Sequence, residues 1–172
     1  MTSAPVALVK NIKNVMENKY LHEVAITAII LKDGKYLITR RSVNKKRWPG
    51  MWTVPGGKLE TGDYINSPKD THGYWYNVLE KVLRREVKEE VGLEISNIEY
   101  LTSLATIHEG NNPSLVISCI ADYAGGEVVL QEEEADLFSW VNLDEAREYE
   151  LIDGIYDELI LAENRRLGIK NE

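Results

Sequence analysis

Three glutamates, Glu86, Glu89 and Glu90, lie within five consecutive positions of the chain. They belong to residues 78–93, in which apolar side chains recur with the spacing of one helix face. On a helical wheel that starts at Val78, the glutamates fall near roughly 80°, 20° and 120°, and Leu79, Val82 and Leu83 lie between about 40° and 140°, whereas Val87 and Val91 blur this stripe. The carboxylates are therefore expected to continue the apolar stripe, away from the basic face of the helix.

This placement of three acids is unfavourable without a counter-charge. Glu86 and Glu90 are four positions apart, so they repel each other by about 0.2–0.5 kcal/mol even when exposed. All three acids lie in the last two turns, where the helix dipole disfavours anions, and partial burial adds a desolvation penalty. A hard divalent cation bound by carboxylate oxygens offsets all three costs. The alternative is a solvated charged face with an Arg85–Glu89 ion pair.

A glycine pair, Gly56 and Gly57, precedes this helix within the segment 55–63. Paired glycines let the backbone come close to a ligand or a metal ion, so the carbonyl of Gly57 is a further candidate ligand. Most glycine pairs are only turns. The position of this pair just before the acidic helix is what favours a functional role.

Together the two segments resemble the signature of the Nudix hydrolase family. That signature reads Gly, five residues, Glu, seven residues, then Arg-Glu-apolar-x-Glu-Glu-x-Gly-apolar. Residues 85–93 match its last nine positions without exception. The opening matches at Gly57, with Asp63 at the position where the family has Glu. The resemblance extends from Glu23 to about Arg166.

Two departures from the signature bear on how its halves meet. Asp63 is one methylene shorter than the expected glutamate, which changes the reach of any ion pair with Arg85. Residues 64–77 form an insertion between the loop and the helix. Loop-closure entropy grows only slowly with length, so an insertion of this size is tolerable. How the loop docks onto the helix is left open at this stage.

The resemblance implies an α+β fold, a Nudix-like α/β/α sandwich with a mixed β-sheet and a loop–helix–loop signature motif. The whole chain, 1–172, is expected to form one such domain, with residues 1–21 as a peripheral N-terminal segment. The implied reaction is attack of water at one phosphorus of a nucleoside diphosphate that is linked to another group. Mg²⁺ or Mn²⁺ suits this chemistry, because it polarises phosphoryl oxygens and lowers the pKa of bound water.

Roles for the signature residues follow from the same resemblance. Glu86, Glu89 and Glu90 are expected to be metal ligands, with the Gly57 carbonyl as an addition. Arg85 is expected to orient these carboxylates and not to bind substrate.

The general base is less well defined. In related enzymes it is a helix glutamate or an acid on a later loop. An acidic run at 131–134 precedes a predicted strand, so we take Glu134 as the first candidate for a base or an extra metal ligand, and Glu133 as the second. The alternative is that this run is a solvated turn.

Candidate substrate-binding residues come from two places. Arg40 and Arg41 end a predicted strand, and the resemblance implies a phosphate-contacting arginine near there, which suits planar bidentate recognition. Tyr74 and Trp75 lie inside the insertion, where they could stack on a base or form a lid. The alternatives are a surface pair of arginines and aromatic side chains that only pack.

All these residues need a scaffold, and local patterns predict one. Asp33-Gly34 is a strong hairpin signal, and Gly92 is placed to end the acidic helix in a left-handed conformation. Strands, then a central helix, more strands and a terminal helix indicate an α+β sandwich. The predicted strands are 24–31, 36–40, 98–107, 114–123 and 137–141, and the predicted helices are 78–91, 144–147 and 152–166.

Length and composition set further limits. A chain of 172 residues fits one domain, and its single cysteine, Cys119, is expected in the core. The net charge of −8 argues against binding duplex nucleic acid through its phosphates. No apolar run reaches the length of about 18–20 residues that crosses a bilayer, and the first residues lack a signal-peptide pattern. We therefore expect a cytoplasmic protein with no membrane partner.

The leading functional hypothesis is a metal-dependent hydrolase that converts a nucleoside triphosphate to the monophosphate and pyrophosphate. An ADP-ribose or nucleotide-sugar pyrophosphatase is the nearest alternative. Residues 40–53 also resemble isopentenyl diphosphate isomerases, but the catalytic cysteine of those enzymes is missing from the stretch that follows. A non-catalytic nucleotide-binding module is a third alternative, although such modules usually lack signature carboxylates. The expected partner is a small-molecule nucleotide, and a homodimer is left open.

Overall fold

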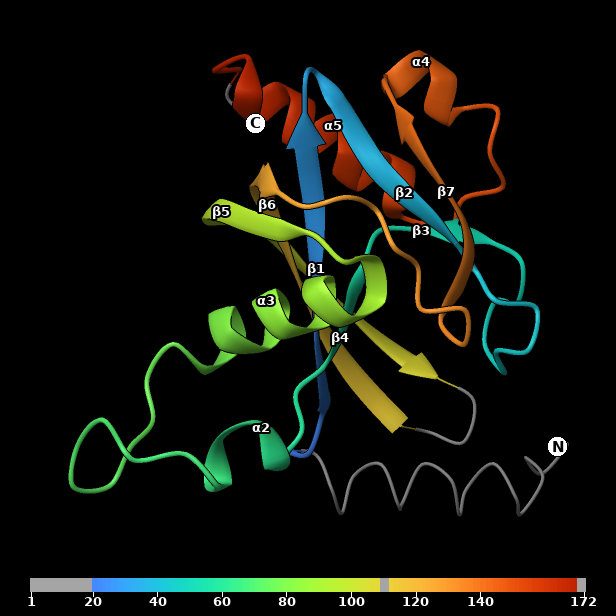
Figure 1. Cartoon of the computed structure of the whole chain (residues 1–172). Helices are drawn as coiled ribbons and strands as arrows, with labels where there is room; N and C mark the ends of the chain where they lie inside the picture. The colour runs from blue at the N-terminus through green and yellow to red at the C-terminus, as the bar shows by residue number, and fades with distance from the viewer. Residues whose placement is uncertain (1–19, 109–111, 170–172) are drawn as a thin grey trace, which may run out of the picture.

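The computed structural model describes residues 20–108 and 112–169 (Figure 1). Most of the predicted peripheral segment, 1–21, lies outside these residues. The strands are β1 (Glu23–Lys32), β2 (Lys35–Arg41), β3 (Trp52–Thr53), β4 (Gly56–Lys58), β5 (Glu94–His108), β6 (Asn112–Gly125) and β7 (Ala135–Val141). The helices are α2 (Gly62–Ile65), α3 (Val78–Val91), α4 (Leu143–Ala146) and α5 (Ile155–Arg166).

β1 is the central strand of a mixed sheet with the order β3-β2-β1-β6-β5. It runs parallel to β6 along nearly its whole length. Its other edge is shared, because β2 pairs with β1 only next to the hairpin and β4 pairs antiparallel with residues 25–27. β7 pairs with β2, and β5 with β6, both antiparallel. This arrangement brings β4 and its glycines beside the middle of the sheet.

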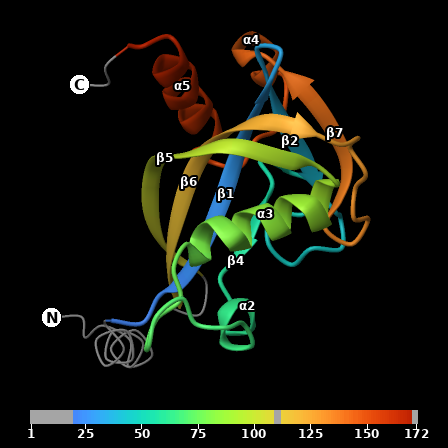
Figure 2. The ribbon, with the colours of Figure 1, turned by 60° about the vertical axis from the view of Figure 1, so that its left-hand side comes forward.

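The helices α3 and α5 cover opposite faces of the sheet (Figures 1 and 2). Successive side chains of β1 alternate between the two faces. Ile26, Ala28 and Ile30 pack with α3 in one hydrophobic cluster, whereas Ile29 packs with α5 in the other. Two separate cores therefore flank one sheet, and the predicted α+β sandwich is confirmed.

Helix α3 begins and ends where the sequence predicts. Gly92 adopts a left-handed conformation with φ of 75°, and its N–H donates to the carbonyl of Lys88. Beyond the helix, the N–H groups of Val129 and Gln131 donate to the carbonyls of Val91 and Glu90. These bonds satisfy the last turn and fix the end of α3 against the loop that leads to β7.

Other elements differ from the prediction at their ends. The hairpin turn is confirmed, with left-handed conformations at Asp33 and Gly34. β5 and β6 are longer than predicted, because their antiparallel pairing continues past bulges into polar ends. Helix α5 begins at Ile155 and not at residue 152, because Gly154 has φ of 89°, which lies outside the range of a right-handed helix. Within residues 20–108 and 112–169, no helix combines the length and apolar character needed to cross a membrane.

Candidate functional site

Helix α3 carries two of the three signature glutamates against the sheet and one toward solvent. Its buried valines and leucine hold the helix on β1, and this orientation leaves the side chain of Glu86 only 21% exposed. Glu90 is also largely covered, whereas the side chain of Glu89 is 55% exposed. The predicted continuation of the apolar stripe therefore holds for Glu86 and Glu90 but not for the carboxylate of Glu89, which is drawn outward to Arg85.

The glycine pair of β4 lies against the carboxylates of Glu86 and Glu90. Gly57 pairs with Ile26 of β1, and a Cβ atom at this position would overlap the carboxylate of Glu86. A Cβ at Gly56 would overlap the backbone of β1. Glycine is thus required at Gly56, where the obstacle is backbone, and at Gly57 it lets the backbone lie against the carboxylate of Glu86 without displacing it.

Glu90 is the most deeply placed acid of the cluster. Its Oε2 accepts a hydrogen bond from the backbone N–H of Gly56 at 3.0 Å. Burial raises the pKa of Glu90 to about 7, although the bond from Gly56 and the charge of Arg41 act in the opposite direction. The neighbouring charges of Glu134 and Glu86 raise this pKa further. Glu90 is therefore a buried acid among other acids, with incomplete compensation of its charge.

The pKa of Glu86 is also raised, chiefly by burial. The guanidinium of Arg85 lowers it, and the charges of Glu89 and Asp63 raise it. A cation close to Glu86 and Glu90 would reverse the shifts of both acids.

Arg85 joins the two halves of the signature. Its guanidinium lies 2.7 Å from Asp63 Oδ1, 2.9 Å from Glu86 Oε1 and 2.8 Å from Glu89 Oε2. The side chain of Asp63 is only 10% exposed, and its second oxygen accepts the backbone N–H of Glu60 at 2.7 Å. The shorter acid and the insertion therefore leave the ion pair with Arg85 intact.

The insertion has its own internal structure. Trp75 donates from Nε1 to the carbonyl of Ser67 at 2.9 Å, and its ring packs against Tyr64 with centroids 5.3 Å apart. Lys69 Nζ lies over the Trp75 ring, 4.9 Å from its centroid. Tyr74 is 69% exposed. Trp75 thus packs inside the insertion, which extends from the N-terminal end of α3 (Figure 1), whereas Tyr74 and Tyr76 are exposed.

The two predicted arginines at the end of β2 have different surroundings. Arg40 makes a bidentate ion pair with Asp136 of β7, with distances of 2.7 and 3.0 Å. Arg41 donates from Nε to the carbonyl of Arg47, and its charge lowers the pKa of Glu90. The charge of Arg41 therefore acts on the acid cluster, whereas the guanidinium of Arg40 is occupied by the carboxylate of Asp136.

The loop before β7 places Glu134 beside the end of α3. Lys45 Nζ lies 2.5 Å from Glu134 Oε2, and the carbonyl of Glu134 accepts the backbone N–H of Ser42. Glu133 is exposed. Sequence reasoning missed both Lys45 and Asp136 as partners, because neither the pairing of β2 with β7 nor the contact between these loops has a local signature.

The oxygen donors on α3 and β4 fit a hard divalent cation. Among residues 20–108 and 112–169, no group of three or more His, Cys, Asp and Glu side chains is arranged so that it could hold a metal ion. Mg²⁺ can be held by fewer protein ligands, because it usually keeps several waters and binds one or two carboxylates together with substrate phosphates. Glu86 and Glu90 provide two carboxylates of this kind, and the backbone of Gly57 lies against Glu86.

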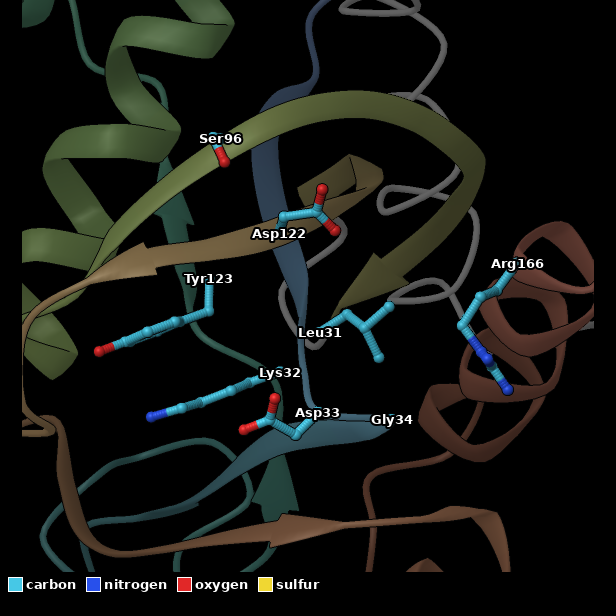
Figure 3. Close-up of a pocket in the computed structure, with 8 residues that line it drawn as sticks. All are labelled: Leu31, Lys32, Asp33, Gly34, Ser96, Asp122, Tyr123 and Arg166. Carbon is cyan, nitrogen blue, oxygen red and sulfur yellow. The ribbon is translucent and has the colours of Figure 1, made fainter.

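A cavity of about 440 Å³ lies elsewhere, at the far end of the β1–β2 hairpin (Figure 3). Lys32 extends beside Tyr123 there, with its Nζ 4.0 Å from the ring centroid. None of the predicted site residues lines this cavity. This cavity is therefore separate from the acid cluster.

Comparison with known proteins decides the family. A profile of the NUDIX domain matches residues 21–160. The chain belongs to the Nudix family. Asp63, Glu86 and Glu89 of its Nudix signature contact Arg85, and Gly57 lies against Glu86.

Individual relatives differ in how much they share with this Nudix chain. The NAD-capped RNA hydrolase NudC of Pseudomonas aeruginosa is 33% identical over 99 residues, which cover 56% of this chain and 28% of NudC. The match thus spans little more than a quarter of that relative. The nucleoside triphosphatase NudI of Salmonella agona is 28% identical over 138 residues, covering 73% and 86% of the two chains. The NUDIX domain of Shewanella oneidensis NrtR, solved with ADP ribose, has a TM-score of 0.66 at 17% identity and covers 90% and 97%.

Proposed function

We propose that this Nudix protein hydrolyses the diphosphate linkage of a nucleotide, with Mg²⁺ or Mn²⁺ as cofactor. Its substrate in this proposal is a nucleoside triphosphate, which gives the monophosphate and pyrophosphate. The observation that carries the proposal is the acid pair Glu86 and Glu90, held against the glycine backbone of β4 without a full counter-charge. The relative with the fuller mutual coverage, NudI, is named a nucleoside triphosphatase, which supports this choice of substrate.

The metal would be held by Glu86, Glu90 and the carbonyl of Gly57, with Glu89 as a further ligand that would first have to leave Arg85. When bound, the cation supplies polarisation of phosphoryl oxygens and a lowered pKa of bound water. Arg85 keeps the carboxylate of Glu86 oriented toward Gly57 through its ion pair. Its contact with Asp63 holds the loop half of the signature against α3.

Glu134 is the proposed general base. It lies close enough to Glu90 to raise the pKa of that acid, and its carboxylate would accept the proton of the attacking water. The substitution Glu134→Gln removes the basic oxygen at nearly constant shape. A turnover loss below about tenfold would remove Glu134 from the mechanism.

Substrate contacts are proposed for the arginines and the insertion. Arg41 would bind a substrate phosphate, and Arg40 would do so only after releasing Asp136. Tyr74 would stack on the base, and Trp75 would support it by holding the insertion in shape.

Two alternatives have their own support. ADP-ribose is the second candidate substrate, because the similar NUDIX domain of NrtR was solved with ADP ribose. Isomerase chemistry would need a thiol near the glycine pair, whereas Cys119 is buried in the core between the sheet and α3. The thiol therefore gives the isomerase alternative no support.

The decisive experiment measures phosphate release from a panel of nucleoside triphosphates, ADP-ribose and nucleotide sugars, with inorganic pyrophosphatase added. We expect phosphate only when Mg²⁺ or Mn²⁺ and a triphosphate are both present. Phosphate released from ADP-ribose or sugar substrates by alkaline phosphatase, and not by pyrophosphatase, would favour the second candidate. No metal-dependent cleavage of any of these compounds would refute the proposed function.

Oligomeric state and location stay predictions. Light scattering of the purified chain tests the homodimer, and imaging of a tagged chain in its host tests the cytoplasmic location.

A further inference from the structure

Three segments meet beside Glu90. The first is the turn after β2, where the N–H of Lys45 donates to the carbonyl of Ser42 at 3.0 Å. The second is the loop before β7, in which the N–H of Glu134 donates to the carbonyl of Gln131 at 2.8 Å. The third is the end of α3, whose Glu90 carbonyl accepts the N–H of Gln131 at 2.9 Å. Backbone hydrogen bonds therefore fix the path of both loops next to the acid cluster.

One side-chain contact joins the two loops. Lys45 Nζ lies 2.5 Å from Glu134 Oε2, and the two side chains are partly covered. Within residues 20–108 and 112–169, the other carboxylate oxygen of Glu134 has no hydrogen-bond partner, so it can face a water molecule. Lys46, the next residue along, is exposed and makes no ion pair with another described residue.

Glu134 needs such a partner, because Glu90 and Glu86 are both acids. Like charges push a mobile carboxylate toward solvent, away from the position that a general base must occupy. The ammonium of Lys45 opposes this repulsion and restricts the carboxylate to one orientation. Partly exposed ion pairs contribute little to the global free energy of unfolding, so the effect of this contact is expected in turnover and in local opening of the two loops.

We propose that Lys45 is a positioning residue, which holds the carboxylate of Glu134 beside the acid cluster while it acts on the attacking water. This inference rests on the proposed diphosphatase function and on Glu134 as its base. The competing role for Lys45 is a direct contact with substrate phosphate, and the two roles predict different kinetics.

A double-mutant cycle separates these roles. For Lys45→Met we expect kcat to fall about tenfold, with KM changed by less than about twofold, as for other residues that orient a reacting group. In the Glu134→Gln background the same substitution is expected to cause no further loss. Lys45→Arg should restore most of the turnover, because it keeps the cation. Lys46→Met is the matched control and should stay within about twofold of the wild type.

Several kinetic outcomes would overturn the proposal. One is a rise in KM at constant kcat in Lys45→Met, which would assign Lys45 to substrate binding. Another is multiplication of the two losses in the double variant, since independent effects mean that Lys45 does not act through Glu134. A loss below about tenfold in Glu134→Gln would also overturn it, because there would be no base to position.

Hydrogen exchange on the metal-free chain distinguishes failure of this proposal from failure of the proposed function. Lys45→Met is expected to speed exchange of the Glu134 and Ser42 amides, whereas Lys46→Met is not. Unchanged exchange at both amides would overturn the positioning role, whatever the activity. Faster exchange in a chain without diphosphatase activity would refute the proposed function and leave the contact between Lys45 and Glu134 standing.

Discussion

Two buried glutamates lie on opposite sides of the same sheet, Glu90 on α3 and Glu158 on α5. Burial is the main cause that raises the pKa of each. Glu158 is in the first turn of its helix, where the dipole favours an anion, and Glu90 is in the last residues of its helix, where the dipole disfavours one. The helix environment is therefore favourable for one acid and unfavourable for the other.

Their partners differ as well. Glu158 Oε2 accepts the hydroxyl of Ser118 at 2.9 Å, and Ser118 in turn accepts the hydroxyl of Thr27 at 3.2 Å. Glu90 has one backbone N–H, two acids and the charge of Arg41 nearby. Only one acid, Asp157, raises the pKa of Glu158, so the larger group of acids around Glu90 is the one that favours a divalent cation. The contrast teaches that burial alone does not indicate a metal site.

The largest expected effect separates the two acids by function. Glu90→Gln should lower metal-dependent turnover by more than about hundredfold, because even residues that only orient a metal ligand cost about 10–100-fold. Calorimetry with Mn²⁺ should show weaker binding in the same variant. Glu158→Gln is the matched control and should bind Mn²⁺ as the wild type does. Equal Mn²⁺ affinity in Glu90→Gln and wild type would break the comparison.

The pH dependence of stability sharpens the comparison between Glu90 and Glu158. Because the folded state raises the pKa of Glu90 from 4.5 to about 7, it binds more protons than the unfolded chain between these values. The free energy of unfolding of the metal-free protein is therefore expected to fall as pH rises through this window, by up to about 3 kcal/mol. The raised pKa of Glu158 acts in the same direction.

Added Mn²⁺ should tell the two contributions apart. At pH above 7 it is expected to restore the stability lost through Glu90, and to leave the part caused by Glu158 unchanged. Urea unfolding of Glu90→Gln and Glu158→Gln, with and without Mn²⁺, measures this. Equal stabilisation of both variants by Mn²⁺ would contradict the assignment.

The glycine of β4 provides a smaller test. Gly57→Ala places a methyl group where the Glu86 carboxylate lies, so the carboxylate must move. We expect turnover and Mn²⁺ affinity to fall about tenfold. Stability should change by less than about 1 kcal/mol, because the displaced group is the mobile end of a side chain. Gly62→Ala, where nothing lies within 4 Å, should change neither quantity.

The smallest effect on metal binding is expected on the α5 side. Ser118→Ala removes the hydroxyl donor of Glu158 and should lower the free energy of unfolding by about 1–2 kcal/mol. Mn²⁺ affinity should be unchanged, since this network faces away from α3. Ser103→Ala on exposed β5 is the control, with an expected change within about 0.5 kcal/mol. A loss of Mn²⁺ binding in Ser118→Ala would show that the two sides are coupled.

The sequence by itself determined the local features of this protein. The hairpin at Asp33-Gly34 and the end of α3 at Gly92 depend on left-handed conformations that few residues adopt, so local residue types specify them. The burial of Glu86 and Glu90 follows from helical periodicity. The prediction failed for Glu89, because the buried stripe also contains Val87 and Val91, near roughly 180° and 220° on the wheel, so its centre lies far from Glu89.

Only the tertiary structure decided which groups complete the site. The bond from Gly56 to Glu90 joins residues 34 positions apart, and the ion pair of Lys45 with Glu134 joins residues 89 apart. Arg40 was expected to be available, but Asp136, 96 positions away, holds it. Such contacts arise from strand pairing and loop packing between distant segments, and no local pattern in the chain encodes them. The signature therefore identified the acids, whereas the fold selected their partners.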